Sequence, residues 1–268
     1  MRGMTLALID VSPPTAPPQR ALSTGPLQAA WARHEDEVQE AQRLRWQVFA
    51  QEMGAHLRPL PGTEPGLDND LFDAHCEHLV VRTLETAQAP AKVVGTYRVL
   101  TPAAARLLGG LYADGEFDLV RLARLRPQIA ELGRSCIHPQ WRQGGVILML
   151  WSSLFDFMQR NRLQLMLGCS SIPLHDGGRL AANLWHRLKH THLAPPELRV
   201  RARLPLPVDR LGTGAPAEPP MLIKGYLRLG AKVLGAPAWD PEFGTADLPM
   251  LLRPQEMPAP YRRRFLGD

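Results

Sequence analysis

The chain has 268 residues, 45% hydrophobic and 21% charged, so it can bury a substantial core and is neither a disulfide-stapled miniprotein, a disordered chain nor a coiled coil. Its three cysteines show no metal-binding or Cys-x-x-Cys spacing, and its longest apolar stretch, 146–158, is shorter than the ~20 residues of a membrane span. The net charge is +5, but no nucleic-acid motif accompanies it. We therefore expect a cytoplasmic protein that binds no nucleic acid.

The first hundred residues predict a lead-in, a helix and a β-hairpin. Residues 1–30 include a Pro-, Ser- and Thr-rich stretch without hydrophobic period, which predicts a disordered lead-in. Apolar residues at helical spacing predict a helix over 37–53, followed by a turn-rich acidic loop over 59–73. Two valine-rich runs predict the strands of the hairpin, 78–84 and 92–100.

The centre of the chain is read as a strand over 129–137, a glycine turn, and an apolar helix over 146–159. We also expect a short helix over 103–108, a buried strand over 163–169, a helix over 179–188 and an exposed strand over 198–204. A Pro/Gly linker over 205–220, an amphipathic segment over 222–234 and a final strand over 248–252 follow. Mixed strands and helices without an internal repeat predict a single α/β domain over 31–268.

Charge is distributed unevenly along the chain. Residues 35–85 contain eleven acidic side chains and four arginines, whereas residues 120–268 contain 21 basic and 11 acidic side chains. The first segment therefore suits a cationic ligand and the second an anionic one, although such runs are often only solvated faces. Of the 31 basic residues 27 are arginine, which binds phosphate and carboxylate with a planar pair of donors.

The turn Arg142-Gln-Gly-Gly145 opens the central helix. A helix N-terminus presents unpaired N–H groups, the glycines Gly144 and Gly145 allow close approach, and Arg142 adds a forked donor, so this turn can hold a phosphate. The alternative is an ordinary tight turn before a helix.

Two charged residues, Glu131 and Arg134, interrupt the apolar strand before this turn. In a regular strand they lie on opposite faces, unless a bulge turns one of them. A buried carboxylate needs a cation, a water channel or a substrate, so Glu131 is a candidate catalytic group. The alternative is a structural ion pair with a nearby arginine.

A third cluster contains Asp68, Asp70 and Asp73, with Arg98 expected across the hairpin. The spacing of these carboxylates does not match a calcium loop, and we predict no metal site. The open alternatives are a solvated acidic loop, a site that holds an amine, and a site that fixes Arg98.

These residues carry a resemblance to a known family. The stretches concerned are Arg45-Trp-Gln-Val-Phe49, Asp70-Leu-Phe-Asp73, Gly95-Thr-Tyr-Arg98 and Glu131-Leu-Gly-Arg134, which resemble the N-acyl-homoserine-lactone synthases. There is a closer resemblance to the bacterial L-ornithine N-alpha-acyltransferase family, the hemolysin-like branch. It is carried by Gly133-Arg-Ser-Cys-Ile-His-Pro139, the Arg142-Gln-Gly-Gly145 turn, Leu167-Gly-Cys-Ser-Ser171, Pro220-Met-Leu-Ile-Lys-Gly-Tyr-Leu-Arg-Leu-Gly-Ala231 and Asp240-Pro-Glu-Phe243. It covers roughly residues 36–266.

The resemblance implies the GCN5-related N-acyltransferase (GNAT) fold, with a central mixed twisted sheet flanked by helices. It also implies transfer of a (3-hydroxy)acyl chain from acyl carrier protein to the α-amine of L-ornithine, giving lyso-ornithine lipid without a cofactor. Ile147 stands where acetyltransferases of this fold have a small residue, which favours the single phosphate of a carrier arm over acyl-CoA. The implied alternatives are another small amine, such as glycine or a homoserine-type acceptor, and a non-catalytic carrier- or lipid-binding protein.

We assign roles to these residues as follows. A free α-amine titrates near ~8 and must lose its proton before it attacks a thioester, and Glu131 is the predicted base. Phosphopantetheine binding is expected of Arg134, Arg142, Gly144 and Gly145. Binding of the amine, or organisation of the site, is expected of Arg45, Asp70, Asp73 and Arg98. The arginines of the segment 261–265 suggest peripheral contact with the inner face of a membrane.

Overall fold

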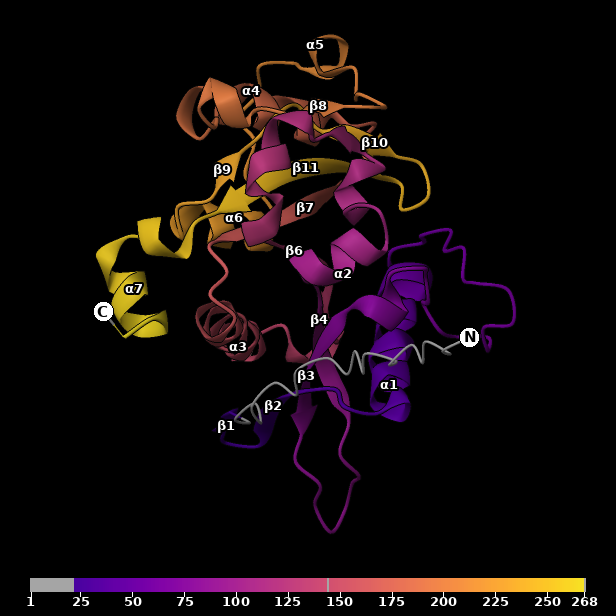
Figure 1. The fold of residues 1–268 in the computed structure, drawn as a ribbon. Coiled ribbons are helices and arrows are strands. Elements are labelled where there is room, and N and C mark those ends of the chain that lie inside the picture. The colour runs from indigo at the N-terminus through magenta and orange to yellow at the C-terminus, as the bar shows by residue number, and fades with distance from the viewer. Residues whose placement is uncertain (1–21, 144, 268) are drawn as a thin grey trace, which may run out of the picture.

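The computed structural model describes residues 22–143 and 145–267, and a nine-stranded mixed sheet runs through them (Figure 1). The strand order is β1-β2-β3-β4-β6-β7-β11-β10, with β9 also paired to β11. Neighbours are antiparallel except β6 and β7, which are parallel. The strands of this sheet are β1 Leu22–Thr24, β2 Leu27–Trp31, β3 Glu77–Thr83, β4 Val93–Leu100, β6 Ile129–Ile137, β7 Leu165–Pro173, β9 Lys232–Val233, β10 Ala238–Asp240 and β11 Thr245–Leu252.

Helices flank the sheet, and two further strands, β5 Phe117–Asp118 and β8 Arg201–Ala202, pair with each other. The α-helices are α1 Glu35–Trp46, α2 Pro102–Leu107, α3 Val146–Arg160, α4 Arg179–Thr191, α5 Val208–Leu211, α6 Met221–Arg228 and α7 Ala259–Phe265. Helix α1 continues as a π-helix, Gln47–Glu52. The α/β class predicted from the sequence is confirmed.

The alternation of buried residues in β3 places one helix on each face of the sheet. Successive side chains of a strand point to opposite faces. Leu79 and Val81 join the core cluster that contains α3, whereas Val80 joins the one that contains α1. All three are fully buried, so this end of the sheet is covered on both sides (Figure 1).

Strands β6 and β7 separate part of the way along their length. They pair over Ile129–Glu131 and Leu165–Leu167, after which β6 remains paired only with β4 and β7 only with β11. At the point of separation a Cβ on Gly168 would lie 2.8 Å from the carbonyl oxygen of Leu132, so a residue without a side chain is required there. The sheet therefore opens directly beyond Glu131.

A β-bulge lies in β6 just after this point. The register between β4 and β6 shifts between Thr96 and Arg98, and Arg134 has a φ of 49°. This left-handed conformation is uncommon outside glycine. The bulge re-aims Arg134, so that it lines the same cavity as Glu131.

The predicted lead-in over 1–30 needs correction at its C-terminal end. Residues 22–24 and 27–31 form the hairpin β1–β2, while residues 1–21 lie outside the described part. Leu27, Ala29 and Trp31 are buried at alternate positions of β2. Three alternating positions next to a proline-rich segment are too short a signal to identify a strand by pattern.

The C-terminal third also differs from the prediction in several places. The exposed strand expected over 198–204 is reduced to β8, and the linker expected over 205–220 contains the one-turn helix α5. Strand β10 and helix α7 were not predicted. These elements are short, and short elements carry little periodicity.

Candidate active site

A cavity of about 810 Å³ lies where β6 and β7 part. Both strands contribute to its walls beyond the point of separation, together with β4, α3 and α6. The opening between the two strands is therefore also the main concave site of the described chain. Glu131 lines it and is 5% exposed.

Backbone N–H groups, and not an arginine, hold the carboxylate of Glu131. Its two oxygens accept hydrogen bonds from Tyr112 at 2.6 Å and from Ala113 at 2.7 Å, both in the 3-10 helix Tyr112–Asp114. Within residues 22–143 and 145–267 it forms no ion pair, which excludes the structural pair weighed from the sequence. A carboxylate has about four lone-pair positions, so two of them stay free for a substrate.

The buried position of Glu131 tunes it for proton transfer near neutral pH. Burial raises the pKa of its carboxyl to about 7, although the two backbone hydrogen bonds and Arg98 oppose that rise. A general base works best when its pKa lies near the working pH. Glu131 therefore has both the position and the acidity that a base in this cavity requires.

Beside Glu131, three arginines and three aspartates form a closed ring of alternating charge, which we call the charge ring. Each arginine contacts two of the aspartates and each aspartate contacts two of the arginines. The members, in ring order, are Arg45, Asp68, Arg134, Asp70, Arg98 and Asp73. The structure thus brings together all four predicted amine-binding or site-organising residues and adds Arg134 and Asp68.

The charges of the ring are neutralised within the ring. Burial alone would raise the pKa of Asp73, but Arg45 and Arg98 outweigh burial and hold that pKa well below its usual range. Arg45 itself is fully buried. Because their carboxylates are paired, this geometry supports the site-organising role of Asp70 and Asp73 over amine binding.

Arg134 occupies a different place from the one expected of a phosphate ligand. Its guanidinium contacts Asp68 at 3.2 Å and Asp70 at 3.1 Å, and it lies over the rings of Tyr112 and Phe243. The guanidinium donors of Arg134 therefore bind the carboxylates of the charge ring.

The predicted phosphate turn is found at the start of α3. Arg142 donates two hydrogen bonds of 2.7 Å to the carboxylate of Glu52, at the end of the π-helix. Gly145 caps α3, and a Cβ there would meet nothing within 4 Å, so this side of the turn is open. Gly144 lies outside the described residues.

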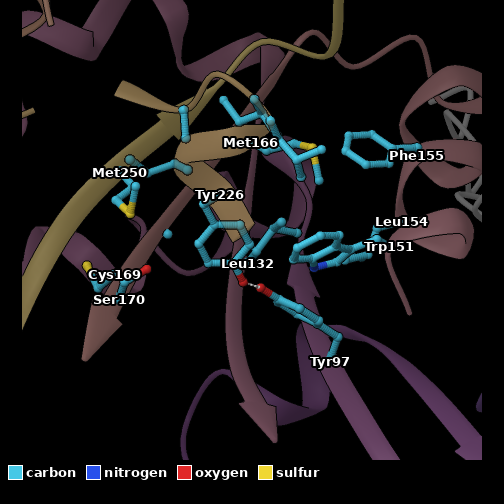
Figure 2. Close-up of a pocket in the computed structure, with 15 residues that line it drawn as sticks. Tyr97, Leu132, Trp151, Leu154, Phe155, Met166, Cys169, Ser170, Tyr226 and Met250 are labelled. Carbon is cyan, nitrogen blue, oxygen red and sulfur yellow. Dashed lines mark hydrogen bonds between the residues drawn. The ribbon is translucent and has the colours of Figure 1, made fainter. Parts of the chain in front are cut away.

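An apolar pocket adjoins the cavity and shares part of its wall. It is lined mainly by α3, β7, β11 and α6, and Figure 2 shows the hydroxyls of Tyr97 and Tyr226 pointing toward each other at its edge, where they form a hydrogen bond. A Cβ on Gly225 would lie 2.4 Å from the Trp151 ring, so this glycine lets α6 approach α3. The motif 220–226 thus helps to build an apolar wall, a role that its sequence alone did not show.

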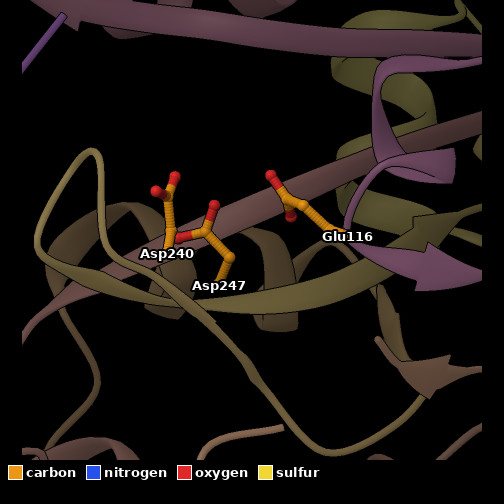
Figure 3. Close-up of side chains that lie close together, drawn as sticks. All are labelled: Glu116, Asp240 and Asp247. Carbon is orange, nitrogen blue, oxygen red and sulfur yellow. The ribbon is translucent and has the colours of Figure 1, made fainter. Parts of the chain in front are cut away.

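A second acidic group lies at the cavity and was missed by sequence reasoning. One carboxylate oxygen from each of Glu116, Asp240 and Asp247 lies within 4.8 Å of the others (Figure 3). Of these, the sequence analysis had quoted only Asp240, as part of a motif. We call this group the acid cluster.

The cavity in the opening of the split sheet is thus lined both by a buried carboxylate and by residues of the turn before α3. Residues 44–152 match the family described as "Acetyltransferase (GNAT) domain". The chain belongs to the L-ornithine N(alpha)-acyltransferase family. It is 36% identical to the L-ornithine N(alpha)-acyltransferase of Rhodobacter capsulatus, covering 87% of this chain and 92% of that protein.

Other relatives agree with this assignment. The protein of the same name from Agrobacterium fabrum is 33% identical, over 91% of this chain and 86% of that protein. Among solved structures, FeeM, an N-acyl amino acid synthase from uncultured soil microbes, has a TM-score of 0.51 at 12% identity, covering 86% of this chain and 92% of that chain, which shows the fold. The predicted family and GNAT fold are thus confirmed, and the protein is an acyltransferase.

In the described part of the chain, no helix has both the length and the apolar character needed to cross a bilayer.

Proposed function

We propose that the protein transfers an acyl chain from a thioester on acyl carrier protein to the α-amine of L-ornithine, giving lyso-ornithine lipid. Relatives at 33% and 36% identity carry the name L-ornithine N(alpha)-acyltransferase. The observation that carries the mechanism is the position of Glu131, which is buried at the parting of β6 and β7 with its carboxylate toward the cavity.

The reaction needs two proton transfers and one exchange of bonds. Glu131 accepts one proton from the α-ammonium group, and the neutral nitrogen attacks the thioester carbon. The C–N bond forms, the C–S bond breaks, and a second proton passes from the nitrogen to the leaving thiolate, so the products are an amide and a thiol. General-base help of this kind contributes about 100- to 10,000-fold to the rate.

The apolar part of the 810 Å³ cavity is a suitable place for the acyl chain, because the adjoining pocket behind Tyr97 and Tyr226 has a volume of only about 50 Å³. The cavity and the pocket share the walls Leu132, Trp151 and Cys169. An acyl chain along Trp151 in the cavity places its thioester near the parted strands, where Glu131 lies.

Two features support a carrier protein as the acyl donor: the turn before α3 and the basic charge of residues 120–268. The N-terminus of α3 and Arg142 offer donors for one phosphate. The surplus of basic residues over 120–268 favours encounter with an acidic carrier protein. Exposed Arg263 and Arg264 of α7 would favour an anionic membrane surface, to which an acylated product also partitions.

Turnover with defined substrates tests the proposal. The full chain is incubated with acyl carrier protein bearing a 3-hydroxyacyl or a plain acyl chain, or with the matching acyl-CoA, and L-ornithine, and products are identified by mass spectrometry. We expect N-α-acylornithine and a faster reaction with the carrier-bound donor. Formation of an acyl-lactone instead, or acylation of glycine but not ornithine, would overturn the acceptor assignment.

A non-catalytic binding protein gives a different result. It would retain acyl carrier protein in a binding assay but release no thiol with any amine. Unchanged turnover after Glu131→Gln would remove Glu131 from the mechanism while leaving the reaction assigned.

A further inference from the structure

The acid cluster differs from the charge ring in that it has no cation of its own. Each carboxylate of the ring lies within 4.0 Å of two arginines. Within residues 22–143 and 145–267, none of Glu116, Asp240 and Asp247 forms an ion pair. Glu116 and Asp240 are half-buried and Asp247 is buried. Carboxylates held this close together without a cation repel one another, so a positive charge brought by a ligand would stabilise them.

Glu116 is the clearest sign of a missing partner. Each oxygen of its carboxyl exposes less than 1 Å², and the thiol of Cys169, a weak and uncharged donor, is the hydrogen-bonding group beside it. Figure 3 shows this carboxyl turned toward those of Asp240 and Asp247. Burial, together with the nearby carboxyls of Asp247 and Asp240, raises the pKa of Glu116 to about 9.

The cluster lies on the same cavity as the proposed base. Asp240 and Asp247 line that cavity together with Glu131. Cys169 of β7 lines this cavity as well. Burial raises the pKa of its thiol, and Glu116, Asp247 and Glu131 each contribute to that rise, so the thiol is close to both sites. A small molecule in this part of the cavity can therefore face Glu131 at one end and the cluster at the other.

Resting on the function proposed above, we propose that Glu116, Asp240 and Asp247 bind the side-chain ammonium group of the acceptor amino acid and so turn its α-amine toward Glu131. A primary ammonium group has three N–H donors, one for each carboxyl of the cluster. Its pKa of ~10.4 keeps it charged while the α-amine, near ~8, gives up its proton. The two amines are thereby distinguished, and only the α-amine reaches the base.

The alternative cation for this cluster is a divalent metal ion. Three carboxyls have enough oxygens for Mg²⁺, which fills its other positions with water. The three N–H donors of an ammonium group match the three carboxyls without added water, and a Glu116 that keeps its proton at neutral pH disfavours a doubly charged ion. A cationic side chain is therefore the ligand we propose, and a bound metal ion is the competing outcome of the test.

The test compares ornithine with norvaline, which is the same amino acid without the terminal amine. We expect the parent chain to prefer ornithine, and Glu116→Gln and Asp247→Asn each to lower kcat/KM for ornithine by at least ~30-fold while changing that for norvaline less than ~2-fold. Calorimetric titration with each amino acid gives the same comparison without turnover. Asp209→Asn, whose side chain is 95% exposed, is the matched control and should behave as the parent.

Three results would overturn the subsite. The variants could lower the activity with ornithine and norvaline equally, they could lower neither, or Mn²⁺ could bind the parent, fail to bind Glu116→Gln and remain bound in excess ornithine. If the parent acylates no amine, the proposed function fails, and the titrations then decide the subsite on their own. Weaker ornithine binding by both variants would still support it.

Discussion

Arg142 and Glu52 are joined by two hydrogen bonds of 2.7 Å, although 90 positions separate them in the sequence. The pair lies beside the turn that opens α3, where the phosphate of the acyl donor is expected. A carboxylate and a phosphate bind an arginine fork in the same way, so Glu52 and the donor compete for Arg142.

Replacing Glu52 should therefore improve donor binding. We expect Glu52→Gln to lower KM for the acyl donor by about two- to fivefold, the range of an exposed ion pair, and Arg142→Ala to raise it. Steady-state kinetics at low salt measure both values. If KM stays unchanged in both variants, Arg142 has no part in donor binding.

The second prediction concerns the base. Glu131→Gln should lower kcat by about 100- to 10,000-fold, because the amide accepts no proton. In the parent chain, burial raises the pKa of Glu131 to about 7, so kcat should rise with pH through that value as the carboxylate forms. Thiol release measures kcat across this pH range, and the Glu131→Gln variant should show no such rise.

The acid cluster should make the protein less stable as pH rises. Burial raises the pKa of Glu116 from 4.5 to about 9 and that of Asp247 from 3.8 to about 6, so the folded chain keeps protons that the unfolded chain has released. The free energy of unfolding then falls with pH over these intervals. Glu116→Gln should flatten the fall and raise Tm at pH 8, by about 2–4 °C per kcal/mol gained.

Thermal melts between pH 5 and pH 9 measure this effect, with Asp209→Asn as the control. A Glu116→Gln variant that melts like the parent at pH 8 would contradict the burial of an unpaired carboxyl at position 116. The parent profile alone does not decide this, because burial also raises the pKa of Glu131 and lowers that of His78.

The charge ring should be sensitive to the loss of one member. Arg45→Ala leaves Asp68 and Asp73 without one of their two partners in a buried site, which should cost about 3–5 kcal/mol of folding free energy. Arg43 of the same helix contacts Glu64 at 3.9 Å on the surface, so Arg43→Ala should cost less than about 0.5 kcal/mol. Urea unfolding of both variants measures the difference, and equal losses would show that the ring does not stabilise the fold.

The contact between Gly225 and Trp151 predicts a change in chain-length preference. A Cβ at position 225 would lie 2.4 Å from the Trp151 ring and displace it, and this ring lines the 810 Å³ cavity. Gly225→Ala should therefore lower kcat/KM more for long acyl chains than for short ones. Competition between donors of two lengths, followed by mass spectrometry, gives the ratio directly.

The central part of the fold and site could be predicted from the sequence because its signals are local. Strand β6 has the predicted bounds, and a charged residue in an apolar strand identified Glu131. The pairing of Arg98 with Asp70 and Asp73 could also be foreseen, since the hairpin faces the acidic loop.

Other parts depend on contacts between distant segments, and no local pattern reports them. Arg134 joins the charge ring only because a bulge turns it. Glu116, Asp240 and Asp247 come from separate segments and resemble ordinary surface acids in the sequence. Gly225 allows α6 to pack against Trp151, and this contact between distant segments cannot be read from the sequence.

The charge ring contains as many guanidinium groups as carboxylates, and each group touches two of the opposite sign. A replacement at any one position removes one of the two partners of each neighbouring group. A single change of charge in the ring therefore disturbs two other members at once, and evolutionary change in this part of the cavity wall is tolerated best when groups of opposite charge change together.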